Sequence, residues 1–319
     1  MAEELTSVEI CAGAGGQALG LEMAGFGHEA VVEIEPPACA TLRLNRPQWN
    51  VLEQDLLEWS GKAYEGVDLF AGGVPCPPFS KAGKQLGAED ERNLFPKAIH
   101  LIDEIRPKAV MLENVRGLLD PVFDTYRADV EGQLKKLGYA AHWRLLNASN
   151  YGVSQLRPRA ILVGIQSDLA ENFDWPVPHE VTPPTVGELL KDLMASKGWG
   201  GADEWAAKAS SIAPTLVGGS KKHGGPDLGP TRARAAWAAL GVEGRTIADD
   251  VPGEDHVGMP RLTVRMAARI QGFPDDWQIF GRKTAAYRQI GNAFPPPVAA
   301  AVGRQIHKAI TARRLHAVA

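Results

Sequence analysis

The sequence predicts an α/β protein with a doubly wound, mostly parallel sheet and a second, smaller and irregular domain. Short apolar runs alternate with helical stretches through the first half of the chain, and a glycine-rich turn directly follows the first run. That alternation stops near residue 165, after which proline, glycine and tryptophan occur in irregular order. Because 319 residues exceed what one core usually serves, we expect a main domain over residues 1–171, a second domain over 172–287, and a segment over 288–319 that returns to the first.

The expected strands are short and apolar, and the helices between them have one apolar face. We expect strands over residues 5–11, 28–34, 51–55, 67–71, 108–114, 140–146 and 160–165, and helices over 18–24, 38–44, 94–105, 126–137, 231–240 and 298–315. In a doubly wound sheet, ligands bind outside the carboxyl ends of the strands. Glycines and polar residues follow several of these ends, so a ligand site is expected there.

The first two strand ends carry features that are typical of a nucleotide-cofactor site. The turn Gly13-Ala14-Gly15-Gly16 opens the first helix, and glycines there let the backbone approach a ligand. Glu33 ends the second strand, where an acid usually binds ribose hydroxyls. Each feature has an ordinary alternative, because many such turns only pack and many such acids are solvated. The turn also lacks the spacing G-x-G-x-x-G.

One cysteine, Cys76, lies in a loop rich in proline and glycine, directly after the run Val67–Ala71. Pro75, Pro77 and Pro78 fix the backbone, and a stiff loop at a strand end can hold a reactive atom still. The alternative is a cysteine that merely packs. The chain has three cysteines and no C-x-x-C pair, which favours a reducing cytosol and argues against disulfides and a zinc site. We therefore expect no metal.

The charge is unevenly distributed along the chain. From residue 221 onward there are 15 Lys and Arg against 8 Asp and Glu, whereas the rest carries 19 against 30. A basic last third on an acidic remainder is expected where one part binds phosphate, although chance variation remains an alternative. No apolar run approaches the roughly 20 residues of a membrane span, and the acidic start gives no sign of a secretory signal. We expect a cytoplasmic protein.

Taken in order along the chain, these motifs resemble the cytosine-C5 DNA methyltransferase family of bacterial restriction-modification systems. The residues that carry the resemblance are Glu9–Gly16, Glu33, Asp55, Pro75-Cys76, Glu113-Asn114-Val115, Gln155-x-Arg157-x-Arg159, Arg261-x-x-x-Arg265-x-x-x-Arg269-x-Gln271-Gly272-Phe273-Pro274 and Gln289-x-Gly291-Asn292-Ala293 with Pro295-Pro296. The resemblance implies a Rossmann-like class I methyltransferase fold. It also implies that residues 172–287 form a target-recognition domain.

The resemblance implies S-adenosylmethionine as the methyl donor and S-adenosylhomocysteine as a product. The implied cofactor residues are Ala12, Gly13, Gly15, Gly16, Glu33, Ile34, Asp55, Leu56, Asn292 and Ala293. The implied substrate residues are Pro75, Ser80, Asn114 and Arg157, together with Lys221, Lys222, Arg232 and Arg234 on the basic part. For Asn114 and Arg157, a structural hydrogen bond that supports a loop is as good an interpretation. Glu9 and Cys11 stand where the family usually has Asp and Phe.

The implied chemistry requires a nucleophile, an acid and a cation around a flipped cytosine. Cys76 would add to C6 of the base as a thiolate, which makes C5 reactive toward the methyl group. Glu113 would hold a proton at N3, and Arg159 would bind the O2 edge. A base inside a duplex is out of reach, so it must be flipped out.

Three other functions compete with methylation of DNA. A related branch of the family acts on tRNA, but a recognition segment of this length favours double-stranded DNA. A non-catalytic nucleic-acid-binding relative would not need Cys76, Glu113 and Arg159. A nicotinamide oxidoreductase would not explain Cys76 or the basic last third. We expect a monomer that acts on double-stranded DNA in association with the nucleoid, paired with a cognate restriction endonuclease, and not on a membrane.

Overall fold

The computed structural model describes residues 4–75, 93–219 and 225–316, with the backbone alone for 313–316. The chain divides into two compact units. Unit 1 comprises Met1–Leu146, Pro158–Val177 and Val298–Ala319, and unit 2 comprises Asn147–Arg157 and Pro178–Pro297. This division differs from the predicted boundaries at 171/172 and 287/288, because residues 172–177 pack within unit 1 and residues 147–157 and 288–297 pack within unit 2. The functions assigned to the ranges remain predictions.

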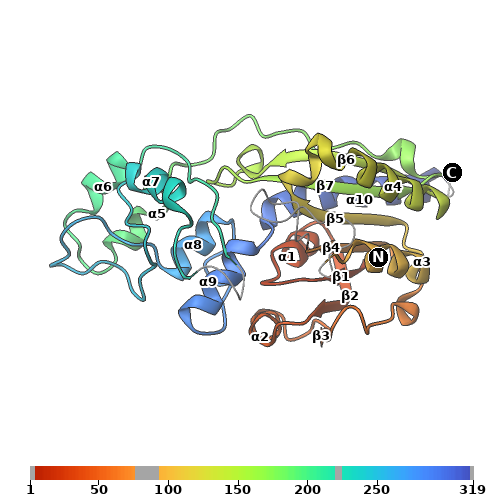
Figure 1. Cartoon of the computed structure of the whole chain (residues 1–319), viewed down its shortest axis with the longest axis horizontal. Coiled ribbons are helices and arrows are strands. Elements are labelled where there is room, and N and C mark those ends of the chain that lie inside the picture. The colour runs from red at the N-terminus through yellow and green to blue at the C-terminus, as the bar shows by residue number, and fades with distance from the viewer. Residues whose placement is uncertain (1–3, 76–92, 220–224, 317–319) are drawn as a thin grey trace. The chain divides into compact units, whose positions relative to one another are not determined.

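The described residues of unit 1 form a seven-stranded sheet with the order β3-β2-β1-β4-β5-β7-β6 (Figure 1). Its strands are β1 (Leu5–Ile10), β2 (Phe26–Glu33), β3 (Val51–Glu53), β4 (Leu69–Gly73), β5 (Ala109–Val115), β6 (Tyr139–Asn147) and β7 (Pro158–Gln166). The pairs β1–β2, β1–β4, β2–β3 and β4–β5 are parallel, and β5–β7 is antiparallel. The predicted mostly parallel sheet is confirmed.

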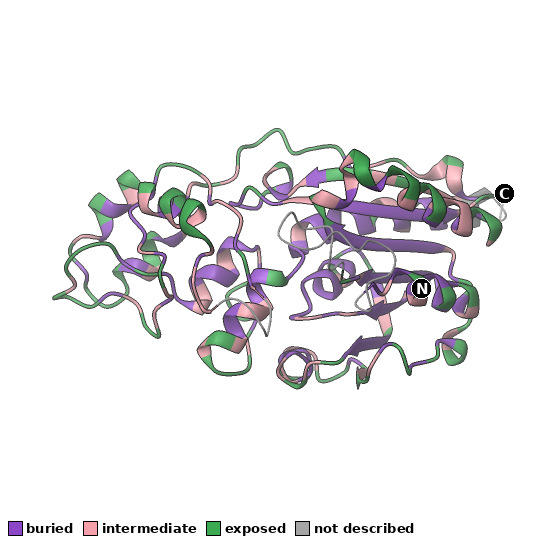
Figure 2. Ribbon diagram, viewed as in Figure 1, coloured by how far each residue is buried: buried purple, intermediate pink, exposed green. Residues whose placement is uncertain are grey.

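Helices pack on both faces of this sheet. They are α1 (Gly16–Met23), α2 (Pro36–Asn45), α3 (Phe95–Ile105), α4 (Asp124–Lys136) and α10 (Pro296–His316), with short 3-10 turns at Lys62–Tyr64, Arg116–Leu119, Pro121–Phe123, Ala148–Tyr151 and Ala170–Asn172. Apolar residues recur every three or four positions along α3, so one of its faces enters the core with Leu134 of α4. Figure 2 shows the resulting layer of buried strands.

Side chains of β1 alternate between the two faces. Val8 and Ile10 enter the core under α3 and α4. Glu9, between them, faces the other side of the sheet, where the Ala18 backbone of α1 interacts with its carboxyl group. The last helix, α10, lies on α1 and β2. Its His307 ring packs edge-on against Phe26 of β2, with 5.7 Å between the ring centroids. The sheet is thus covered on both sides, as a doubly wound fold requires.

Unit 2 is more helical than the irregular domain that the sequence predicts. Its helices are α5 (Val186–Ala195), α6 (Ala202–Lys208), α7 (Thr231–Ala239), α8 (Val264–Ile270) and α9 (Lys283–Asn292). The expected helix over 231–240 corresponds to α7. Helix α5 begins with a capping box, in which Thr185 accepts a hydrogen bond from the Glu188 backbone and Glu188 accepts one from the Thr185 backbone. It crosses α6 so closely that a Cβ on Gly187 would lie 2.0 Å from the Ala206 carbonyl oxygen.

Candidate active site

The turn after β1 has a backbone that favours glycine. Cys11, Gly13 and Gly15 all have positive φ angles, of 52°, 55° and 82°. The Gly15 N–H donates to the Ala12 carbonyl at 2.9 Å and closes the turn, and α1 begins at the next residue. A Cβ on Gly13 would meet nothing within 4 Å, so the turn faces open space at that point. Ala12 itself is buried, with 8% of its surface exposed.

The Glu33 carboxylate holds this turn to the end of β2. It accepts hydrogen bonds from the backbone N–H groups of Gly13 at 2.7 Å, Ile34 at 2.9 Å and Glu35 at 2.8 Å. Only 6% of Glu33 is exposed, and this burial raises the pKa of its carboxyl group, although the three N–H groups act in the opposite direction. Burial and the hydrogen bonds therefore fix the position of this acid.

The neighbouring positions differ in exposure. Ile34 follows Glu33 directly and leaves 54% of its surface exposed. Asp55 follows β3, and its Oδ1 atom accepts a hydrogen bond from the Leu57 N–H at 2.9 Å. Leu56 is buried, with 5% exposed, and belongs to the core under α3. An exposed isoleucine beside a fixed acid offers an apolar surface for a flat ring, whereas Leu56 supports the core.

Parallel pairing brings these strand ends to one edge of the sheet. Glu33 pairs with Glu53 of β3, Ile10 pairs with Gly72 of β4, and Gly73 pairs with Glu113 of β5. The glycine turn, Glu33, Asp55 and Glu113 therefore all follow or end strands at the carboxyl edge, where ligands bind in doubly wound sheets. Unit 1 thus brings together the residues that the sequence singled out at this edge.

Glu113 and Arg159 form a nearly buried ion pair at this edge. The Arg159 Nε atom lies 2.7 Å from Glu113 Oε1, and the two side chains are 13% and 12% exposed. Antiparallel pairing of β5 with β7 places Arg159 opposite Val115, two residues beyond Glu113. Burial lowers the pKa of Arg159, and the adjacent Glu113 opposes that effect. The pair joins a carboxylate and a guanidinium, which can bind two atoms of a planar polar ring.

Asn114 connects the end of β5 to the chain just before the cysteine loop. Its Nδ2 group donates to the Val74 carbonyl at 2.9 Å, and its Oδ1 atom accepts from the Val115 N–H at 2.8 Å. Val74 is buried, and Pro75 after it is exposed. Cys76 and Ser80 lie outside the residues that the structure describes. Asn114 therefore fixes the point from which that loop departs.

Arg157 lies in unit 2 and is almost completely buried, with 1% exposed. Its guanidinium donates to the carbonyl oxygens of Leu216 at 2.8 Å, Gly291 at 2.8 Å and Ala293 at 3.0 Å. These contacts favour a supporting role over direct contact with a substrate.

Among the other predicted residues of unit 2, Ala293 is buried, with 7% of its surface exposed, and the rest are exposed, half-buried or outside the described ranges. Asn292 is exposed, and its Nδ2 group donates to the Gly219 carbonyl at 3.2 Å. Arg232 is exposed on α7, and Arg234 on the same helix is half-buried. Lys221 and Lys222 lie beyond what the structure describes. Asn292 and Ala293 both belong to unit 2.

Two residues at the carboxyl edge were not predicted as site residues. Glu9 is fully buried, and burial raises the pKa of its carboxyl group well above the usual range, helped by the nearby Glu33. Gly73 lies so close to Glu113 that a Cβ on it would be 3.3 Å from Glu113 Oε2. The double glycine Gly72-Gly73 before the cysteine loop was the available signal, since strand glycines often mark a close approach.

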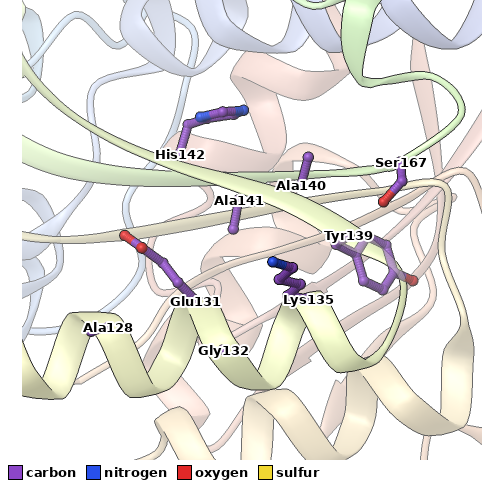
Figure 3. A pocket seen from close by; sticks show the side chains of 9 residues that line it. All are labelled: Ala128, Glu131, Gly132, Lys135, Tyr139, Ala140, Ala141, His142 and Ser167. Carbon is purple, nitrogen blue, oxygen red and sulfur yellow. The ribbon is translucent and has the colours of Figure 1, made fainter.

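A cavity of about 420 Å³ lies elsewhere in unit 1, between α4 and the edge strand β6 (Figure 3). It is lined by Ala128, Glu131, Gly132, Lys135, Tyr139, Ala140, Ala141, His142 and Ser167. None of these residues belongs to the predicted site. Within the described ranges, no cluster of His, Cys, Asp and Glu is arranged to hold a metal ion, and no helix is both long and apolar enough to cross a membrane.

Comparison with known proteins identifies the family of the chain. Residues 5–308 match the family model of the C-5 cytosine-specific DNA methylases. The chain is 59% identical to the type II methyltransferase M.NgoMIV of Neisseria gonorrhoeae, over 96% of this chain and 98% of that protein. It is 57% identical to the type II methyltransferase M.NaeI of Lentzea aerocolonigenes, over 97% of this chain and 76% of that protein.

Solved structures share the fold. One is a DNA modification methyltransferase encoded within an Escherichia coli prophage, with a TM-score of 0.70 at 20% identity over 96% of this chain and 99% of that chain. Another is DNMT2 of Spodoptera frugiperda, with a TM-score of 0.66 at 19% identity over 95% of this chain and 99% of that chain. The family match spans both units and the site residues, and the expected family is confirmed: the chain belongs to the C-5 cytosine-specific DNA methylases.

Proposed function

We propose that this DNA (cytosine-5-)-methyltransferase transfers a methyl group from S-adenosylmethionine to a flipped cytosine in duplex DNA, through a covalent bond between Cys76 and C6. The observation that carries the proposal is the buried Glu113–Arg159 pair beside the strand end that leads into the Cys76 loop. A carboxyl group and a guanidinium at this spacing can bind N3 and O2 of one cytosine ring.

The carboxyl edge of unit 1 offers groups that fit the adenosine part of the cofactor. Gly13 faces open space, so a ligand can approach the turn without meeting a side chain. The fixed Glu33 carboxylate can accept hydrogen bonds from ribose hydroxyls, and the exposed Ile34 can pack on the adenine ring. When bound, the cofactor supplies an electrophilic methyl group on a sulfonium and becomes S-adenosylhomocysteine.

The residues of the chain carry out the remaining steps. The Cys76 thiolate adds to C6, and the electron pair of the C5–C6 double bond passes through the ring toward N3, where Glu113 holds a proton. Carbon 5 then takes the methyl group. Loss of the C5 proton to a base, expulsion of the Cys76 thiolate and return of the N3 proton to Glu113 restore the ring.

Asn114 and Arg157 act on loops and not on the base. Asn114 anchors the start of the cysteine loop through the Val74 carbonyl. The basic residues Lys221, Lys222, Arg232 and Arg234 provide positive charge for DNA phosphates. We further infer that the enzyme is a cytoplasmic monomer associated with the nucleoid, and that it protects DNA from a cognate type II restriction endonuclease.

Transfer of a radiolabelled methyl group tests the proposal on two polymers, duplex plasmid DNA and tRNA. We expect incorporation into DNA and not into tRNA, and bisulfite sequencing should place the product at cytosines within one short sequence. Cys76→Ser should abolish incorporation while S-adenosylhomocysteine still binds. Incorporation by Cys76→Ser at the wild-type rate would remove Cys76 as the nucleophile, and incorporation into tRNA alone would overturn the choice of substrate.

A further inference from the structure

The segment Ala213–Gly219, which we name the strap, is held on two sides by other parts of unit 2. It runs without helix or strand structure, apart from an isolated bridge between Ala213 and Gln155. Its last residue, Gly219, is one residue short of the basic residues Lys221 and Lys222 that were predicted to contact DNA. The contacts that hold the strap therefore also hold Gly219, the last described residue before the two lysines.

One side of the strap pairs with the segment that contains the two buried side chains Gln155 and Arg157. The Leu216 N–H donates to Gln155 Oε1 at 2.9 Å, and the Leu216 carbonyl accepts from Arg157 Nη1 at 2.8 Å. The Thr215 hydroxyl donates to the Leu156 carbonyl. Both polar groups of the Leu216 backbone are thus satisfied by side chains 59 and 61 residues away in sequence.

The other side of the strap lies against the end of α9 without any intervening side chain. A Cβ on Gly291 would lie 2.4 Å from the Cα and N atoms of Gly218, and a Cβ on Gly218 would lie 2.7 Å from the Arg288 carbonyl oxygen. Two glycines therefore let the two backbones touch. The Arg157 guanidinium joins both sides, since its Nη2 group donates to the Gly291 and Ala293 carbonyls.

A third buried side chain completes the arrangement. Gln155 Nε2 donates to Gln271 Oε1 at 2.6 Å, and Gln271 Nε2 in turn donates to the Ala293 carbonyl. Gln155 and Gln271 are both fully buried. Such a network holds its members in one arrangement, because any member that moves leaves a buried polar group unpaired.

We propose that Gln155 and Arg157 are positioning residues for target recognition: they lock the strap on α9, so that discrimination between the target sequence and near-target sequences depends on them. The inference rests on the proposed function, because it concerns the DNA that the enzyme methylates. Arg157 is two residues from Arg159 in the chain, so the same short segment carries the guanidinium that supports the strap and the one that pairs with Glu113.

The test compares purified variants of the full chain on short duplexes. The target is first found by bisulfite sequencing of plasmid DNA treated with the wild-type enzyme. Each enzyme is then assayed on a duplex with this target and on duplexes with one substituted base pair, and the discrimination ratio is the quotient of the kcat/KM values. Gln155→Met removes the acceptor for Leu216, and Gly218→Ala forces the strap off α9. Gly132→Ala is the matched glycine control, since a Cβ on Gly132 in α4 would meet nothing within 4 Å.

We expect Gln155→Met and Gly218→Ala each to lower the discrimination ratio by about tenfold, which corresponds to a typical single-base-pair preference. KM for the target duplex should rise more than kcat falls, and affinity for S-adenosylhomocysteine should stay within about twofold. Gly132→Ala should match the wild type.

An unchanged ratio in both variants, with rates that fall equally on every duplex, would overturn the proposal and leave Gln155 and the strap with a purely structural role. If Gln155→Met does not fold, Gly218→Ala perturbs the same segment from the opposite side and still decides. Failure of the proposed function is distinct, because the wild-type chain would then methylate no DNA.

Discussion

The Glu113–Arg159 pair leads to a prediction in which stability and catalysis respond differently. In the wild-type chain, Arg159 Nε lies 2.7 Å from Glu113 Oε1. Glu113→Gln replaces this carboxylate by an amide of the same shape and leaves the Arg159 guanidinium buried beside a neutral group. Removal of one member of a buried ion pair costs about 3–5 kcal/mol. Because both side chains are only 12–13% exposed, we expect a loss near 3 kcal/mol in the free energy of unfolding. Methyl transfer should slow by about 10²–10⁴-fold, as for a lost general acid.

A double-mutant cycle separates the two effects. Glu113→Gln, Arg159→Met and the double variant are compared by urea unfolding, followed by tryptophan fluorescence, and by single-turnover methyl transfer. The double variant should lose much less stability than the sum of the single losses, since it leaves no buried charge unpaired. Losses that add within about 0.5 kcal/mol would refute the pairing. Activity should not recover in the double variant, because the proton at N3 and the contact to O2 are both absent.

Three further predictions concern the surroundings of the site and the second unit. Asn114→Ala removes the hydrogen bond to the Val74 carbonyl and should lower kcat by about tenfold, measured by single turnover. Its affinity for the cofactor, measured by calorimetry, should stay unchanged, and a tenfold loss of that affinity would contradict this prediction. Gly187→Ala should destabilise the chain by about 1–3 kcal/mol in urea, because a Cβ there would overlap the backbone of α6, whereas Gly132→Ala should not. The pKa of Glu9 is raised in the folded chain, so its contribution to the free energy of unfolding should fall as pH rises above about 4.5. Glu9→Gln should remove that fall. A difference in unfolding free energy between this variant and the wild type that stays constant between pH 5 and 8 would contradict the prediction.

The carboxyl edge of the sheet could be predicted because its signals are local. Each apolar run ends at a glycine, an acid or an asparagine, and parallel pairing then aligns the ends. The antiparallel β7 could not be predicted in this way, because periodicity identifies a strand without giving its neighbour or direction. Yet this pairing brings Arg159 to Glu113. The resemblance to a family suggested the two residues, and the topology supplies the reason they meet.

Unit 2 was less predictable for two reasons. Some signals were present and unused: Thr185 with Glu188 forms a capping box, and Thr263 caps α8, so both helix starts could have been found. Other features have no local signal. The hydrogen bond between Arg157 and Leu216 joins residues 59 apart in sequence, and the glycine contact between the strap and α9 depends on the tertiary arrangement. A sequence pattern gives the residue types at such contacts and not their partners.

The buried acids Glu33 and Glu9, beside the glycine turn after β1, also affect which thiol can react. Burial raises the pKa of Cys11, and the adjacent carboxylates of Glu33 and Glu9 raise it further. Burial, with a contribution from Glu33, raises the pKa of Cys39 to about 12, and its thiol donates a hydrogen bond to the Glu33 carbonyl. A nucleophilic cysteine must be a thiolate near neutral pH, and acids around a thiol oppose that form. Two of the three cysteines are therefore unsuited to attack on a base, which supports the proposal that Cys76 is the nucleophile.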